Sequence, residues 1–98
     1  SKTGNITNNN PFEFALSQNY PNPFNPNTVI SYSIASEGNV TLKIFNSAGQ
    51  QVSELVNAYQ NAGIYNVEFN ASSLSSGVYF YRLDANGFTA TNKMILVK

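Results

Sequence analysis

Short stretches of alternating apolar and polar residues constrain the fold of this chain more than any other feature. In one of them, Ile30, Tyr32 and Ile34 alternate with serines. A repeat of two residues is the period of a β-strand that buries one face and exposes the other. Similar stretches recur roughly every 8–12 residues between Gly, Asn, Ser or Pro, and no helical period lasts longer than a turn. The sequence therefore predicts an all-β fold, with strands at Phe12–Leu16, Thr28–Ala35, Val40–Ile44, a shorter Gln51–Val56, Tyr65–Phe69, Val78–Ala85 and Phe88–Val97.

About seven short strands with one long connection favour an immunoglobulin-like antiparallel β-sandwich over a small barrel. Two turns carry hairpin residues, because Gly49 supplies a positive φ and Asn86-Gly87 is a strong two-residue hairpin signal. We expect Leu74 to plug one end of the sandwich. Phe80 interrupts the polar side of its strand, which predicts cover on both faces at that point.

The run from Gln18 to Thr28 holds three prolines and four asparagines around two aromatic residues. Each proline fixes φ near −65° and lacks an amide donor, so no helix crosses this run. Asn side chains bond nearby backbone in turns. We expect an ordered turn, called the lip below, with Tyr20 and Phe24 packed against the core. The turn-forming residues are Asn19, Pro21, Asn22, Pro23, Phe24, Asn25 and Pro26 in the lip, and Gly49 in the middle hairpin.

The composition excludes most catalytic chemistry. The 98 residues contain no cysteine and no histidine, and five basic residues balance five acidic ones. The chain therefore lacks a thiol nucleophile, a disulfide and an imidazole base or metal ligand. The sequence has no cluster of Lys and Arg residues that could bind the phosphates of a nucleic acid. Its longest apolar run, Met94–Val97, is far too short to span a membrane. We expect no enzyme activity, no cofactor, no metal ion, no nucleic-acid partner and no membrane insertion.

Exposed aromatic residues are the best hint of a small ligand. Tyr59, Phe80 and Phe88 are candidates for a strip that stacks on sugar rings, although core or edge packing explains them more simply. No carboxylates cluster in the predicted strands, which disfavours a glycosidase pair or a calcium site. One alternative function is therefore an accessory spacer or carbohydrate-binding module of an extracellular hydrolase.

Four motifs in order give a more specific signal. They read QNYPNPFNPNTVISY, VTLKIFNSAGQQV, AGIYNVEFNASSLSSGVYFYRL and, at the end of the chain, KMILVK. From about Leu16 to Lys98 the chain resembles the type A C-terminal sorting domain of the bacterial type IX secretion system (Por secretion family). The immunoglobulin-like domain of the flagellar hook-capping protein has a related pattern.

The resemblance implies a non-catalytic module at the end of a larger cargo protein. Such a module directs its cargo through the periplasm and the outer membrane to the cell surface or the medium. Its implied partners are the type IX translocon and a cysteine-protease sortase that commonly removes it. Residues 1–11 are then a linker or N-terminal arm that follows the cargo, and residues 12–98 are the sorting domain.

The resemblance also implies recognition residues. The Gly-x-Tyr element and the closing Lys-Met-x-Leu-x-Lys fall on Gly77, Tyr79, Leu83, Lys93, Met94, Leu96 and Lys98. The final strand is an edge candidate with unpaired backbone groups, so a receptor could add a strand to it and read Lys93 and Lys98 as flanking charges. The same lysines also suit the protection of an edge against aggregation. An uncovered final strand could also pair between chains, so the oligomeric state stays open at this point.

Overall fold

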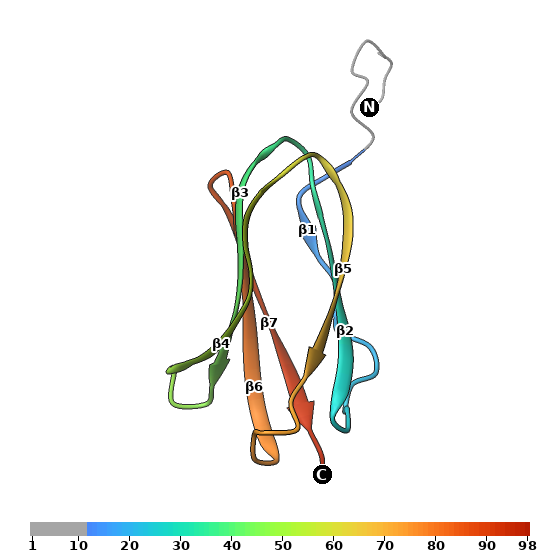
Figure 1. Cartoon of the computed structure of the whole chain (residues 1–98), viewed down its shortest axis with the longest axis vertical. Helices are drawn as coiled ribbons and strands as arrows, with labels where there is room; N and C mark the ends of the chain where they lie inside the picture. The colour runs from blue at the N-terminus through green and yellow to red at the C-terminus, as the bar shows by residue number, and fades with distance from the viewer. Residues whose placement is uncertain (1–11) are drawn as a thin grey trace.

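The computed structural model describes residues 12–98, which form antiparallel strands in two facing sheets (Figure 1). The predicted linker, residues 1–11, lies outside the described residues. One sheet has the order β1-β2-β5 and the other the order β4-β3-β6-β7. This confirms the prediction of an all-β sandwich of seven strands. The strands are β1 (Ala15–Leu16), β2 (Asn27–Ile34), β3 (Gly38–Asn46), β4 (Gln51–Gln60), β5 (Gly63–Asn70), β6 (Gly77–Ala85) and β7 (Phe88–Leu96).

The strand order is that of an immunoglobulin-like sandwich with one change. In a constant-type domain the first, second, fifth and fourth strands share one sheet, and the third, sixth and seventh form the other. Here β4 pairs with β3 in the second sheet and leaves β5 as an edge of the first. Because β4 also ends the second sheet, two of the sandwich's edges belong to consecutive strands, β4 and β5.

The core follows from the period-two pattern. Inward positions on β2, β3 and β6 are almost fully buried, and the outward positions between them are exposed or half-buried. Leu74 packs against this core from the connection between β5 and β6, as predicted. The buried core residues are Phe24, Ile30, Tyr32, Ile34, Val40, Leu42, Ile44, Phe69, Ala71, Tyr79, Tyr81, Leu83, Ala85, Met94 and Leu96.

Strand β4 departs most from the predicted boundaries. The prediction of a shorter strand, Gln51–Val56, is wrong, because β4 continues to Gln60 and pairs with β3 along its whole length. The register shifts twice, between Leu42 and Lys43 and between Ile44 and Phe45 of β3. Each bulge adds a residue to β4 and interrupts the alternation of apolar and polar residues. The sequence pattern therefore does not indicate the full length of this strand. The first strand is also shorter than predicted, since pairing begins only at Ala15.

Both predicted hairpin turns are confirmed. Gly49 has a φ of 85°, and its amide donates to the carbonyl of Asn46 at 3.0 Å. Asn86 and Gly87 have φ values of 49° and 82°, the signs that a two-residue turn of type I′ requires. No helix in the described part of the chain is long and apolar enough to span a membrane.

Candidate functional site

The lip is held by a buried polar cluster. Asn19 and Thr28 are buried, and the Asn19 Nδ2 donates to Thr28 Oγ1 at 3.0 Å and to the carbonyl of Pro21 at 3.1 Å. Thr28 Oγ1 donates to the same Pro21 carbonyl at 2.9 Å. The hydroxyl of Tyr81 accepts from the Asn19 amide at 2.8 Å and donates to the carbonyl of Ser17 at 2.7 Å. Buried polar groups need such partners, so these bonds define the path of the lip.

The two lip aromatics differ in position. Phe24 is 2% exposed and packs against Phe69, with ring centroids 6.2 Å apart, as predicted. The prediction that Tyr20 packs against the core is wrong, since Tyr20 is 81% exposed. The backbone of Tyr20 pairs with Val29, which faces outward on β2, while Asn19 and Thr28 occupy the inward positions beside it. The three Xaa-Pro bonds of the lip, at Pro21, Pro23 and Pro26, are cis.

The segment from Phe14 to Phe24 runs alongside β7. Phe14 stacks on Phe88 at 5.5 Å, and the Asn92 Nδ2 donates to the Leu16 and Ser17 carbonyls at 3.3 and 3.2 Å. The Gln18 Nε2 donates to the Lys93 carbonyl at 2.8 Å. Both segments therefore advance in the same direction along the outer edge of the four-stranded sheet.

The contact becomes a parallel backbone pairing at the end of β7. The Ile95 amide donates to Asn22 Oδ1 at 3.0 Å, the Phe24 amide to the Ile95 carbonyl at 2.9 Å, and the Val97 amide to the Phe24 carbonyl at 2.9 Å. Strand β7 is terminal in its sheet, as predicted, but the expectation of unpaired backbone groups is wrong from Lys93 to Val97. The lip covers this edge.

A last set of bonds closes the same end. The Lys98 Nζ donates to the carbonyls of Ser72 at 2.7 Å and Leu74 at 2.6 Å, and the Lys98 amide donates to Ser76 Oγ at 3.0 Å. Gly77 begins β6 opposite Leu96. We call the place where the lip, the end of β7 and the β5–β6 connection meet the lip–β7 corner, made of Asn22, Phe24, Lys93, Ile95, Val97 and Lys98.

The predicted recognition residues divide into two groups. The side chains of Tyr79, Leu83, Met94 and Leu96 are buried in the core, where a partner of the folded domain cannot touch them. Lys93 and Lys98 are exposed, and Gly77 is half-buried. Lys93 and Lys98 belong to the corner, and Met94 and Leu96 alternate with its β7 residues while their side chains enter the core. Leu83 lies farther along β6, opposite Ala90.

The predicted turn residues are likewise divided. Pro21, Asn22, Pro23 and Asn25 are exposed on the lip, and Pro26 is half-buried. Gly49 lies apart from them, in the turn between β3 and β4. The pairing of the lip with β7 escaped sequence reasoning, because it joins segments separated by about 70 residues and leaves no local pattern.

The aromatic strip expected for a sugar ligand does not form. Tyr59 is exposed near the end of β4, whereas Phe88 packs against the core and stacks on Phe14. Phe80 faces outward on β6 and is half-buried by its neighbours on the sheet, so the expected cover by another layer is absent from the described structure. The chain has no His or Cys, so only Asp and Glu side chains could hold a metal ion among these residue types. Within residues 12–98, no three of them come together as a metal site.

Two buried tyrosines of the sandwich have shifted pKa values. Burial raises the pKa of Tyr81, against the opposing effect of its hydrogen bonds with Asn92 and the Asn19 backbone. Burial likewise raises the pKa of Tyr32, whose hydroxyl donates to Gln60 Oε1 at 2.6 Å. Both phenols are therefore neutral hydrogen-bonding groups near neutral pH, and they serve structure rather than proton transfer.

Comparison with known protein families matches residues 18–98 to the secretion system C-terminal sorting domain. The match begins with the lip and includes β2 to β7. Neither the curated proteins nor the solved structures yield a match. The matched family is non-catalytic, and its members carry cargo to the cell surface or the medium under recognition by the type IX machinery. The chain belongs to this family and is a C-terminal sorting domain for type IX secretion of cargo proteins.

Proposed function

We propose that the type IX translocon reads this domain in its folded state, at the lip–β7 corner. The observation that carries the proposal is the direct backbone pairing of the first and last family motifs, at Phe24, Ile95 and Val97. A short terminal signal read as an unfolded peptide would not need the lip, about 70 residues earlier, to hold it. The paired motifs instead form one surface.

The corner offers side chains rather than free backbone. Since the lip already bonds the edge of β7 from Lys93 to Val97, strand addition there would first have to displace the lip. Lys93 is exposed, and its ammonium group forms no ion pair or hydrogen bond with any part of residues 12–98, so it is the charge that a receptor can read. The ammonium group of Lys98 is bound to two carbonyls and anchors the corner instead.

We further propose that the cargo precedes the arm at residues 1–11 and that a sortase separates cargo from domain after transport. Residues 12–98 form the folded unit in this proposal. Because the lip covers the edge of β7 from Lys93 to Val97, strand-mediated self-association has to use another edge, and β5 suits it best. Its register with β2 is regular over eight residues, whereas β4 carries two bulges that protect an edge. Sedimentation velocity across a concentration series tests this, and a monomer at every concentration contradicts it.

The test of the corner is a secreted fusion. A fluorescent cargo with an export signal is placed ahead of the full chain in a bacterium with a type IX system, and the cargo on the surface and in the medium is measured. Deletion of residues 93–98 removes Met94 and Leu96 from the core, so it would abolish sorting through unfolding alone. The sharper variant is Lys93→Glu, which changes an exposed side chain.

We expect Lys93→Glu to reduce display and Lys93→Arg to keep it. Glu68→Lys, an exposed charge reversal on the outer face of the other sheet, is the matched control and should display normally. Thermal unfolding of each purified chain verifies that all three remain folded. Normal display of a folded Lys93→Glu variant would contradict recognition at the corner.

A further inference from the structure

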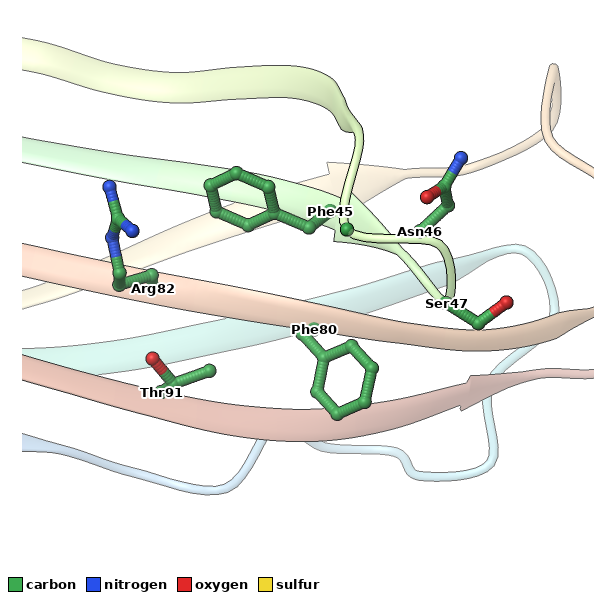
Figure 2. A pocket seen from close by; sticks show the side chains of 7 residues that line it. Phe45, Asn46, Ser47, Phe80, Arg82 and Thr91 are labelled. Carbon is green, nitrogen blue, oxygen red and sulfur yellow. The ribbon is translucent and has the colours of Figure 1, made fainter.

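A hollow of about 290 Å³ opens on the outer face of the four-stranded sheet, beside the hairpin between β3 and β4. Figure 2 shows the rings of Phe45 and Phe80 on this face, with Arg82 and Thr91 along the strands and Asn46 at the hairpin end. Phe45 and Phe80 lie directly opposite each other on β3 and β6. A hollow beside two half-buried aromatic rings can receive one apolar side chain of a partner, since binding energy concentrates where such side chains fill pockets.

Basic side chains lie in and beside the hollow. Lys93 lies opposite Phe80 on β7, and Lys43 lies opposite Arg82 on β3. Three of the four basic side chains within residues 12–98 therefore share this face, and only Lys98 lies elsewhere.

The basic side chains differ in their partners. Arg82 is already engaged, since its Nε bonds Asp84 Oδ2 at 3.0 Å and its guanidinium lies 5.2 Å from the centre of the Phe45 ring. Lys43 faces Glu54 in the register of β3 and β4, but these two form no ion pair. Within the described part of the chain, the ammonium groups of Lys43 and Lys93 are left without a charge partner.

We propose that this hollow binds an extended acidic segment of a protein of the secretion machinery. One aromatic or aliphatic side chain of that segment enters between Phe45 and Phe80, and flanking carboxylates reach Lys43 and Lys93. The inference rests on the proposed function, because it assumes that the machinery reads the folded domain. It shares Lys93 with the lip–β7 corner and adds the aromatic hollow and the chemistry of the partner.

The spacing fits an acidic residue on each side of the anchor. Strands lie about 4.8 Å apart, and alternate residues of an extended chain about 6.8 Å apart. Lys93 is one strand beyond Phe80, and Lys43 is two residues from Phe45 along β3. Lys93 therefore lies across the strands from the aromatic pair, and Lys43 lies along β3 from it. Because the two lysines lie in different directions from the anchor and both have long side chains, one carboxylate on each side of the anchor is the simplest complement, which gives the pattern acid-x-aromatic-x-acid.

The charge of the face favours a protein segment over a membrane or a polyanion. Lys43, Arg82 and Lys93 are offset by Glu54 and Asp84 on the same face, which leaves one net positive charge. Anionic lipid surfaces are bound by clusters of about four to eight basic residues, and nucleic acid by extended basic patches. Two separated lysines beside an aromatic hollow instead match a short segment that carries two carboxylates.

The first arm of the test uses the full purified chain and two blocked peptides. Asp-Gly-Phe-Gly-Asp is the probe, and Asn-Gly-Phe-Gly-Asn is its uncharged control, each titrated while backbone amide resonances are followed by NMR. We expect the acidic peptide to shift the resonances of Phe45, Gly49 and Phe80 and to bind more tightly than the control. Phe80→Ala should weaken binding by about tenfold or more, and Lys93→Gln by roughly two- to fivefold. Ile64→Ala, on the exposed face of the other sheet, should leave it unchanged. Equal binding of the two peptides, or shifts away from the hollow, would overturn the proposal.

The second arm places Phe45→Ala/Phe80→Ala in the cargo fusion, beside Lys93→Glu. Reduced display by a folded double variant supports the proposal, and normal display overturns it. Because Phe45 and Phe80 lie outside the lip–β7 corner, a failure of the hollow proposal can be told apart from a failure of the corner proposal. Normal display of the double variant with loss for Lys93→Glu leaves the corner standing, and normal display of both removes the corner as well.

Discussion

Replacement of Phe24 by alanine is the strongest single test of how the lip is built. Phe24 lies in the lip between β1 and β2, outside any regular strand. Its ring is nevertheless almost fully buried against Phe69, and its backbone bonds Ile95 and Val97. If the lip were a surface loop, truncation there would cost little. If it is part of the core, the cost is that of a core aromatic.

The magnitude follows from the burial. A buried aromatic side chain removes about 150–200 Å² from water, which at about 25 cal/mol per Å² is worth roughly 4–5 kcal/mol. Measured Phe→Ala losses in cores are about 3–5 kcal/mol. A domain of this size has a total stability of about 5–15 kcal/mol, so the loss would be a large share of it. With a urea m-value of about 1–2 kcal/mol/M, the midpoint should fall by about 2–4 M.

Tyr20→Ala in the same lip is the matched control. Tyr20 is exposed, so its truncation should cost less than about 0.5 kcal/mol. Urea unfolding of both variants, followed by far-UV circular dichroism and by tyrosine fluorescence, measures the difference. Equal midpoints for Phe24→Ala and Tyr20→Ala would refute the argument that the lip belongs to the core.

Three further predictions concern buried polar groups and turns. Asn19→Leu removes bonds to Pro21 and Thr28 within a buried cluster and should lower the free energy of unfolding by about 1–3 kcal/mol, as measured in urea. Burial raises the pKa of Tyr81 in the folded state above the value of about 10 expected in the unfolded chain. The contribution of this phenol to the free energy of unfolding is therefore complete below the unfolded pKa and is lost as pH rises through the folded pKa. The urea midpoint should be flat from pH 7 to 9 and fall above pH 10. A midpoint that rises above pH 10 would contradict this sign. Gly38→Ala places a methyl group against the side-chain amide of Asn86, whose Nδ2 donates to the Glu37 carbonyl at 2.7 Å. This variant should lose more stability than Gly49→Ala, where only the φ of 85° opposes a side chain. Thermal melts compare the two, and a larger loss at Gly49 would count against the packing at Gly38.

The alternating pattern predicted most strands and which of their faces are buried. Ile30, Tyr32 and Ile34 face inward as their spacing requires, and Asn86-Gly87 forms the hairpin that its residue types favour. These features are local, since the period of a strand and the φ of a turn depend on a few neighbouring residues. The pattern failed at β4, where two bulges break the period.

By itself, then, the sequence determined an all-β sandwich with a proline lip, its hairpins and its membership of a sorting family. Only the tertiary structure decided that the lip bonds the edge of β7 and that Tyr20 faces solvent while Phe24 is buried. It also decided that Phe45, Phe80 and unpaired lysines share one face of the second sheet. The physical reason is that alternation specifies the face of a strand but not its neighbour, and the neighbour decides which groups remain open to a partner.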